Sequence, residues 1–210
     1  QDIKFSNNDT EFNLVFDNKK IKLQLKVPGL HNVYNALGAI SVACHLGVNI
    51  DDIKLGLAKY TGVKRRFDVK FDDKVIIVDD YAHHPEEISA TIEAAKSGWN
   101  RRVVVIFQPH LFTRTENFHL DFARALSKSD IVFITDIFPA REKPIKGVTS
   151  QLIIDDLKEI GFNAIYYIKD QNQIIDELIG IIKDGDMMIT MGAGDIWKQN
   201  IQLCEYFKSE

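Results

Sequence analysis

Ionisable residues crowd together in the stretch DDYAHHPEE, residues 79–87, directly after the apolar run VIIV. Its carboxylates and imidazoles can hold a charged ligand or transfer protons near neutral pH. Polar or glycine-rich stretches follow three further apolar runs: QPHLFTRT at 108–115, DIFPAREK at 136–143 and GAGD at 192–195. Each stretch alone could occupy an ordinary surface turn. Because four of them follow apolar runs, we predict that together they form a ligand-binding site.

Arginine and glycine in these stretches indicate an anionic ligand. Arg114 and Arg141 each carry a planar guanidinium, which binds carboxylate or phosphate through two hydrogen bonds. Gly192 and Gly194 would let a ligand approach the backbone closely at the start of a helix. The glycine pattern is not the dinucleotide-binding fingerprint, because Trp197 stands where the third glycine belongs.

Three histidines, His83, His84 and His110, lie in the same stretches. A lone histidine on a loop is more often a surface group than a catalyst, but this shared setting favours contact with a ligand. The residues alone leave open which of the three makes that contact. Asp79 and Asp80 have a structural alternative, because aspartate side chains commonly cap turns and helices.

The elements that position these residues can be predicted from apolar runs at 75–78, 103–107, 131–135, 164–168 and 187–191. Continuous runs rich in β-branched residues are typical of strands buried on both faces. Their alternation with helical patterns predicts a parallel sheet. We therefore predict an α/β fold with a Rossmann-like, doubly wound, mostly parallel sheet. Ligands of such sheets bind outside the carboxyl ends of the strands, where the polar stretches lie.

Residues 1–64 have a different pattern, which predicts a small α+β segment. Strands at 12–16 and 20–27 flank a turn-prone link and predict a hairpin. A helical period runs from His31 to a stop at Gly47. A second short helix is predicted from about Asp51, as its N-cap, to Tyr60.

The basic stretch TGVKRR, residues 61–66, marks the predicted domain boundary between 1–64 and 65–210, although a charge run is usually a solvated linker. The first crossover helix of the second part should begin at Pro85 and close at Gly98.

Composition bounds the function. The chain has 210 residues and a net charge of −4, which gives no sign of nucleic-acid binding. Its apolar runs are shorter than a membrane span, and no secretory signal opens the chain, so we predict a cytoplasmic protein. Because the chain begins with Gln1 rather than methionine, we expect a fragment of a longer protein.

Six motifs resemble the ATP-dependent Mur ligases of peptidoglycan synthesis, in the order of that family and over nearly the whole chain. They are GLHNVYNALGAISVA, GVKRRF, VDDYAHHPEEI, FQPHLFTRT, DIFPAREKPIKGV and TMGAGDIW. The resemblance is greatest to the members that join L-alanine to UDP-N-acetylmuramate. FQPH with PAREKPI favours these members over the murein-peptide recycling ligase.

The resemblance implies that residues 1–64 end a central ATP-binding domain and that residues 65–210 form a complete carboxyl-terminal domain. The phosphate-binding pattern GxxxxGK[ST] is missing from the sequence, so we expect the fragment to be inactive alone. The family uses ATP and Mg²⁺, and the metal ligands would lie mainly in the part of the parent enzyme outside this chain. UDP-N-acetylmuramate and L-alanine would be the substrates, joined through an acyl-phosphate intermediate.

Roles for individual residues also follow from the resemblance. It assigns His31, Asn32 and Asn35 to the adenine, Arg66 to the phosphates and Asp80 to the ribose hydroxyls. Asn32 and Asn35 lie one helical turn apart, so their amides could share one face.

The catalytic residues implied by the resemblance are Arg66, His84 and His110. The substrate-binding residues that it implies are Tyr81, His84, His110, Arg114, Arg141, Lys143, Gly192 and Gly194. Arg114 is the candidate for the carboxylate of L-alanine. The chain departs from the family at Leu111 and Phe112, where Arg-Tyr is frequent, and at Phe138, where tyrosine is more usual.

Two alternatives from other classes remain open. A metal-dependent phosphohydrolase could use Asp79, Asp80, His83, His84 and His110 as ligands, but adjacent histidines on an extended segment tend to point to opposite sides. A noncatalytic binding domain is the second alternative.

Overall fold

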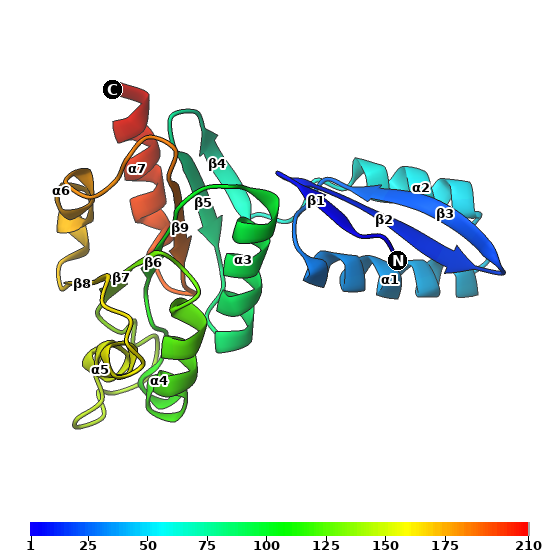
Figure 1. The fold of residues 1–210 in the computed structure, drawn as a ribbon. Helices are drawn as coiled ribbons and strands as arrows, with labels where there is room; N and C mark the ends of the chain where they lie inside the picture. The colour runs from blue at the N-terminus through cyan, green and yellow to red at the C-terminus, as the bar shows by residue number, and fades with distance from the viewer. Residues whose placement is uncertain (210) are drawn as a thin grey trace. The chain divides into compact units, whose positions relative to one another are not determined.

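The computed structural model describes residues 1–209 of the chain (Figure 1). These residues form two compact units. The first consists of residues 1–64 together with 93–100, and the second of residues 65–92 together with those from 101 onward. Within the described residues, no helix combines the length and the apolar character needed to cross a membrane.

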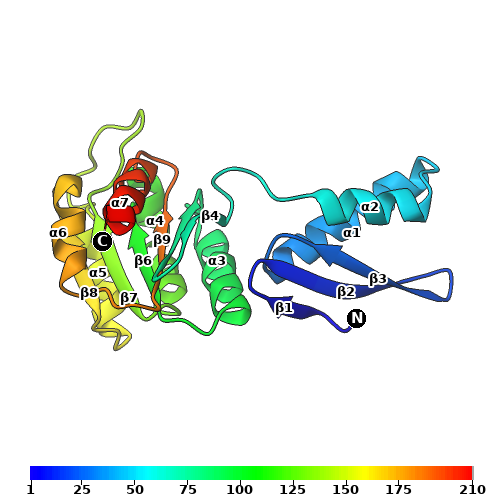
Figure 2. The same cartoon turned by 90° about the horizontal axis from the view of Figure 1, so that it is seen from above.

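A three-stranded antiparallel sheet and two helices make up the first unit. They are β1 (Lys4–Ser6), β2 (Asp9–Phe16), β3 (Lys19–Leu25), α1 (Leu30–His45) and α2 (Ile50–Lys59). Figure 2 shows both helices on the same side of this sheet. Apolar residues of the helices and strands meet in one buried cluster: Phe12, Leu23, Leu25, Val27, Val33, Ala36, Ile40 and Ile53.

The predicted hairpin is confirmed by the pairing of β2 with β3, which ends with Phe16 opposite Lys19. Asp17 and Asn18 connect the strands with φ values of 48° and 59°. Both residues therefore have the left-handed conformation of a type I′ turn, which aspartate and asparagine tolerate better than most residues.

The predicted N-cap of the second helix is wrong by two positions. Asn49 precedes α2, and its side chain accepts a hydrogen bond from Asp51 N at 2.9 Å. Asp51 lies instead in the first turn, where a negative charge favours the helix dipole. Asparagine and aspartate are both good N-caps, so composition alone could not separate the two positions.

A six-stranded sheet forms the centre of the second unit, in the order β4-β5-β9-β6-β7-β8. β4 pairs antiparallel with β5, and the other neighbouring strands are parallel, which confirms the predicted mostly parallel α/β fold. The strands are β4 (Asp68–Asp72), β5 (Ile76–Asp80), β6 (Val103–Phe107), β7 (Ile131–Thr135), β8 (Ile165–Ile168) and β9 (Met187–Met191).

Helices cover both faces of this sheet, so the predicted double winding is also confirmed. They are α3 (Pro85–Gly98), α4 (Phe112–Leu126), α5 (Gln151–Glu159), α6 (Ile174–Ile179) and α7 (Trp197–Ser209). Figure 2 shows α6 and α7 on one side, and α3, α4 and α5 on the other. Leu178 of α6 and Leu203 of α7 share a buried cluster with alternate strand residues. Phe107, on the opposite face of β6, packs on Phe122 of α4.

The strand β4 was not predicted. Its residues Asp68, Lys70 and Asp72 are charged, with Asp68 half-buried and the other two exposed, and no apolar run marks the strand. β4 is an edge strand, and edge strands commonly carry charges because these discourage pairing with other chains. The predicted strands β5, β6, β7 and β9 are buried at every position.

The position of β9 determines where a ligand can bind. This last strand lies between β5 and β6. The helices that follow β5 and β6 cover one face of the sheet, whereas α7, which follows β9, covers the other (Figure 2). Neighbouring strands thus send the chain toward opposite faces, which is the place where doubly wound sheets bind ligands.

Candidate functional site

The loops that follow β5, β6 and β9 meet at the carboxyl edge of the sheet. Gly192 N, after β9, donates to Asp80 O, at the end of β5, at 3.2 Å. Gln108 Nε2, after β6, donates to Asp195 Oδ1 at 2.8 Å. These bonds confirm the predicted convergence for three of the four loops.

The loop after β7 joins them through Phe138. Phe138 N donates to Pro109 O at 2.8 Å, and Leu111 N donates to Phe138 O at 3.0 Å. The Phe138 ring stacks on His110 with 5.8 Å between centroids and 12° between planes. Leu111 has a φ of 74°, a left-handed conformation that few non-glycine residues adopt, and its hydrogen bond to Phe138 helps to hold it.

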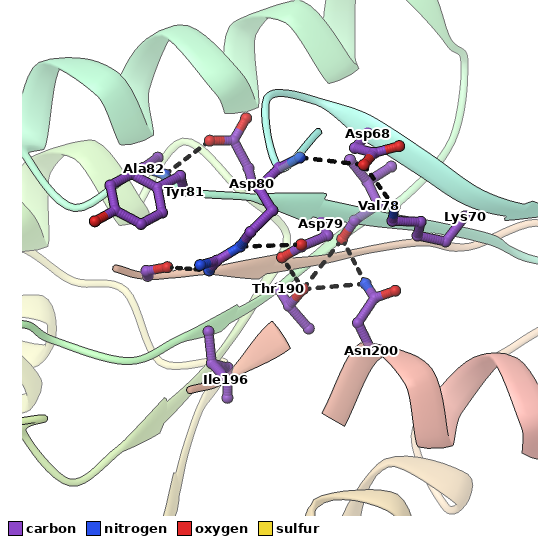
Figure 3. A network of polar contacts seen from close by, with 12 residues as sticks. Asp68, Lys70, Val78, Asp79, Asp80, Tyr81, Ala82, Thr190, Ile196 and Asn200 are labelled. Atoms are coloured by element: carbon purple, nitrogen blue, oxygen red, sulfur yellow. Dashed lines mark hydrogen bonds and ion pairs between the residues drawn. The ribbon is translucent and has the colours of Figure 1, made fainter. Parts of the chain in front are cut away.

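Asp79 and Asp80 are consecutive on β5, and their side chains point to opposite faces of the sheet (Figure 3). They are only 3% and 4% exposed. Asp80 Oδ1 accepts from Ala82 N at 2.7 Å. Asp80 Oδ2 accepts from Phe67 N at 2.9 Å and from Thr91 Oγ1 at 3.1 Å. Burial raises the pKa of Asp80 although these bonds favour its charged form. Asp80 therefore shapes its loop, and a contact with ribose stays a prediction.

On the other face, Asp79 contacts Arg65 and Thr190. Arg65 Nε lies 3.2 Å from Asp79 Oδ2, and Thr190 Oγ1 donates to Asp79 Oδ1 at 3.3 Å. Burial raises the pKa of Asp79, and the charge of Arg65 offsets this only in part. Asp80 caps a turn through Ala82 N, as in the structural alternative predicted for it, whereas Asp79 contacts the side chains of Arg65 and Thr190 instead.

Arg66 is exposed beside Tyr81 and Glu87. Its guanidinium carbon lies 5.5 Å from the centroid of the Tyr81 ring, and Nη1 lies 3.4 Å from Glu87 Oε1. Burial opposes ionisation of Glu87, but the hydrogen bond from His83 N and the charges of His83 and Arg66 lower its pKa. An exposed arginine with one long ionic contact can turn toward an anionic ligand at little cost.

His83 is oriented by the start of α3. Glu87 Oε2 accepts from His83 N at 3.0 Å and from His84 N at 3.2 Å, as in a capping box. His83 Nδ1 lies 2.8 Å from Tyr81 O and 3.3 Å from Glu87 Oε2. Because both neighbours are acceptors, Nδ1 carries the hydrogen and Nε2 keeps its lone pair when His83 is neutral.

His110 and Arg114 complete a cluster with His83. The rings of His83 and His110 are 6.0 Å apart. Arg114 Nη1 lies 3.3 Å from His110 Nδ1, and 3.5 Å from His83 O. Since arginine only donates, His110 accepts at Nδ1 and carries its hydrogen on Nε2. Burial lowers the pKa of His110, and the charge of Arg114 and that of His83, when His83 is protonated, lower it further, which favours the neutral form of His110.

His84, which the resemblance placed in the catalytic group, lies elsewhere. Its ring contacts Phe118 of α4, with 5.2 Å between centroids. It lines a pocket of about 400 Å³ between α3 and α4. The structure therefore brings His83, rather than His84, to His110, because adjacent residues before the helix point in different directions.

The glycines of the GAGD turn allow close packing at this edge. A Cβ on Gly194 would lie 2.3 Å from Gln108 Oε1 and 2.6 Å from the Phe138 ring. Gln108 cannot easily move, because it is 2% exposed and its Oε1 accepts from Ile196 N at 3.2 Å. A Cβ on Gly192 would lie 2.9 Å from Gln108 O.

Arg141 and Lys143 are exposed on the loop after β7. Between them, Glu142 Oε2 accepts from Thr113 N at 3.0 Å, which ties this loop to the start of α4. Both cationic side chains therefore lie in solvent on a loop that is attached to the start of α4. Their role in substrate binding stays a prediction.

The residues predicted to contact adenine lie in the first unit, at the start of α1. Asn32 Nδ2 donates to Pro28 O at 2.7 Å, and Asn35 Nδ2 donates to Asn32 Oδ1 at 3.4 Å. The two amides therefore share a face of the helix, as their spacing predicted. Their contact with adenine, and that of the half-buried His31, stays a prediction.

The phosphohydrolase alternative would need both aspartates and the histidines around one metal ion. Asp79 is directed to Arg65, and Asp80 to backbone amides. In the described part of the chain, residues 1–209, no three His, Cys, Asp or Glu side chains are grouped to hold a metal ion.

Arg65, Glu87 and Gln108 shape the site, although none of them was singled out as a site residue from the sequence. Glu87 follows His83 by four residues, a helical spacing that could have revealed their contact. Gln108 directly follows a strand, as ligand-binding residues of this fold often do. Arg65 lies in a basic run, and no sequence signal separates it from Arg66.

A doubly wound sheet with polar side chains at its carboxyl edge places this chain in the class of doubly wound α/β proteins, whose ligand sites lie at that edge. Family models identify the family within that class. The model described as Mur ligase, glutamate ligase domain, matches residues 65–194, and the Mur ligase middle domain matches residues 1–43. The chain belongs to the Mur ligase family, which confirms the predicted resemblance.

Relatives agree with this assignment. A protein of Geotalea uraniireducens named UDP-N-acetylmuramate–L-alanine ligase is 45% identical over 90% of this chain and 42% of its own length. The crystal structure of UDP-N-acetylmuramate–alanine ligase from Thermotoga maritima matches with a TM-score of 0.82 and 30% identity, over 99% of this chain and 45% of that one. A murein peptide ligase from Psychrobacter arcticus shares the fold, with a TM-score of 0.64 and 23% identity. The match covers 95% of this chain and 42% of that one. The chain thus spans less than half the length of these proteins.

Proposed function

We propose that this chain is the carboxyl-terminal part of an ATP-dependent ligase that joins L-alanine to UDP-N-acetylmuramate in the cytoplasm, for peptidoglycan precursor synthesis. The grouping of Arg114, His110 and His83 at the carboxyl edge of the sheet supports this proposal most directly. Residues 1–64 would end the central ATP-binding domain, and residues 65–210 would form the carboxyl-terminal domain.

The reaction has two steps in this proposal. The carboxylate of UDP-N-acetylmuramate attacks the γ-phosphorus of ATP, which gives an acyl phosphate and ADP. The amine of L-alanine then attacks the acyl carbon, and phosphate leaves from a tetrahedral intermediate. Arg66 stabilises the transferring phosphoryl group. An arginine in this role can raise the rate of phosphoryl transfer by about a thousandfold or more. The Mg²⁺ ligands are assigned mainly to the part of the parent enzyme outside this chain.

L-alanine binds through complementary groups of the cluster. Arg114 uses only Nη1 for its hydrogen bonds to other described residues, so Nη2 and Nε can bind the alanine carboxylate in a fork. His110 donates from Nε2 to an oxygen of the intermediate. His83, with its lone pair on Nε2, accepts a proton from the amine. The resemblance assigned a catalytic role to His84, and we propose His83 for proton transfer because its ring faces that of His110.

The remaining assignments follow the family. His31, Asn32 and Asn35 contact adenine, and Asp80 lies next to the ribose. Tyr81, Arg141, Lys143, Gly192 and Gly194 border the substrates.

Product formation by the full-length protein tests the proposal. Incubation with ATP, Mg²⁺, UDP-N-acetylmuramate and L-alanine should give a UDP-sugar heavier by one alanine residue, detected by mass spectrometry. Omission of ATP or of L-alanine should abolish the product. Exclusive use of a preformed murein peptide in place of L-alanine would instead identify a recycling ligase.

A further inference from the structure

Two strained residues flank Arg66. Arg65 has a φ of 60° and Phe67 a φ of 45°, both in the left-handed region. Such conformations cost roughly 1–3 kcal/mol for residues other than glycine, and they persist where surrounding contacts hold them. The contacts of these two residues therefore show what fixes the backbone around Arg66.

Hydrogen bonds attach both neighbours of Arg66 to the end of β5. Tyr81 N donates to Arg65 O at 2.7 Å. Phe67 N donates to Asp80 Oδ2 at 2.9 Å, and the Phe67 side chain is buried. Arg66 is thus presented from a segment that is anchored on each side, while its own side chain is exposed.

The side chain of Arg65 extends this anchor to the loop after β9. Arg65 Nε binds Asp79 Oδ2 at 3.2 Å, and Arg65 Nη2 donates to Gly192 O at 2.7 Å. Its guanidinium carbon also lies 4.9 Å from the centroid of the Tyr81 ring. One cation therefore joins three segments that the proposed chemistry uses.

A hydrogen-bonded row holds Asp79 in place. Thr190 Oγ1 donates to Asp79 Oδ1 at 3.3 Å, and Asn200 Nδ2 donates to Thr190 Oγ1 at 3.0 Å. Figure 3 shows Asp79, Thr190 and Asn200 in succession from β5 through β9 to α7. The carboxylate that orients Arg65 is therefore itself fixed by the sheet and by the helix behind it.

We propose that Arg65, oriented by Asp79, is a positioning residue that fixes Arg66 relative to the turn at 192–195. This inference rests on the proposed ligase function. Arg65 acts through Arg66 and Gly192 and does not itself touch the reactants. The fork of arginine is required, because the ammonium of lysine is a single point charge and cannot reproduce two contacts in fixed directions.

The alternative is that the pair only stabilises the fold. Buried ion pairs are weak contributors to stability, because loss of hydration offsets their attraction. A positioning role makes a different prediction, because a displacement of about 1 Å at a reacting centre can lower the rate about a hundredfold.

The test uses the full-length protein with Arg65→Lys, and Arg124→Lys as the matched control. Arg124 is exposed, and within residues 1–209 its guanidinium pairs with Asp121 on its own helix. We expect Arg65→Lys to lower kcat roughly tenfold to a hundredfold, with KM values for L-alanine and UDP-N-acetylmuramate within about threefold of wild type. Arg124→Lys should leave kcat unchanged. Asp79→Asn should lower kcat similarly, and the double variant should be no worse than the single ones, because both act through one contact.

Hydrogen exchange provides a second readout. Backbone amides in peptides covering 65–68 and 190–195 should exchange faster in Arg65→Lys, and in Asp79→Asn if the first variant fails to fold. A kcat per folded molecule equal to wild type in either variant, or unchanged exchange in both segments, would overturn the positioning role. A wild-type protein that makes no product would instead refute the proposed function on which this inference rests.

Discussion

At the scale of single residues, a hydrogen bond joins Arg114 to His110, and its direction determines which nitrogen of His110 carries the hydrogen. Arginine can only donate, so His110 must present a lone pair at Nδ1 and a hydrogen at Nε2. The stacked Phe138 ring and the nearby His83 hold the same ring in place. The cluster therefore offers a cationic fork and a neutral donor side by side, which suits an amino acid whose carboxylate must be held while its amine reacts.

Loss of the Arg114 side chain should weaken binding of L-alanine selectively. We expect Arg114→Ala in the full-length protein to raise KM for L-alanine roughly tenfold to a hundredfold, since hydrogen bonds to charged groups contribute about 1.5–3 kcal/mol. KM for ATP should change little. Arg124→Ala, on the exposed side of the same helix, is the control. Steady-state kinetics with equal loss for both substrates would contradict the carboxylate assignment.

The pKa of His110 should make stability depend on pH. Burial lowers this pKa below its ordinary value of 6.5, and the charge of Arg114 and that of His83, when His83 is protonated, lower it further, against a weaker opposite influence of Glu142. The unfolded chain then binds the proton first as the pH falls. The contribution of neutral His110 to the free energy of unfolding is therefore fully present above about pH 6.5. It is lost as the pH falls toward the lowered pKa of His110 in the folded protein. Urea unfolding of wild type and His110→Gln at pH 7.5 and pH 5.5 should show the greater loss in wild type. An NMR titration of His110 with its midpoint at or above 6.5 would contradict this expectation.

At the scale of elements, much of the arrangement could be predicted from the sequence. The strands β5, β6, β7 and β9 are continuous apolar runs because they are buried on both faces. Their assignment as strands and their parallel pairing could therefore be predicted from the sequence. Since parallel strands share a carboxyl edge, the meeting of the loops followed from the strands. The directions of side chains within a loop did not follow, because they depend on contacts between distant segments.

His83 and His84 illustrate this limit. The two residues are identical in type, and only the start of α3, with Glu87 as its cap, turns one toward His110 and the other toward Phe118. Similarly, the family resemblance assigned a role to Arg66 in the basic run, whereas the structure shows that the adjacent Arg65 contacts Asp79 and Gly192.

The close packing of the GAGD turn gives a prediction about stability. Gly194→Ala should lower the free energy of unfolding by about 1–3 kcal/mol, because the added Cβ would overlap the fixed Gln108 side chain and the Phe138 ring. Gly180→Ala is the matched control. Gly180 follows α6 with a φ of −74° and has open space around its Cα. Its substitution should leave stability within about 1 kcal/mol of wild type. Urea denaturation with equal effects of both changes would disagree with the packing described here.

At the scale of the whole molecule, this chain contributes one side of the proposed reaction. In the proposed function, the cluster of Arg114, His110 and His83 supplies groups for the amino acid, and Arg66 supplies charge for the phosphates. The phosphate-binding pattern GxxxxGK[ST] does not occur in the sequence, and the curated relatives are more than twice as long. The proposed chemistry therefore requires residues beyond these 210.

For the isolated chain we expect folding without ligation. Circular dichroism should show a cooperative thermal transition, and phosphate release from ATP should not respond to L-alanine or UDP-N-acetylmuramate. The full-length protein serves as the positive control under the same conditions. Amino-acid-dependent ATP hydrolysis by the 210-residue chain alone would contradict this expectation.

The proposed function depends above all on binding of L-alanine at the carboxyl edge of the sheet. The most direct measurement is a crystal structure of the full-length protein with a non-hydrolysable ATP analogue, UDP-N-acetylmuramate and L-alanine. We predict that the alanine carboxylate lies within hydrogen-bonding distance of the Arg114 guanidinium, beside the rings of His83 and His110. Alanine bound instead in the pocket beside His84 and Phe118, or at the amino edge of the sheet, would contradict it.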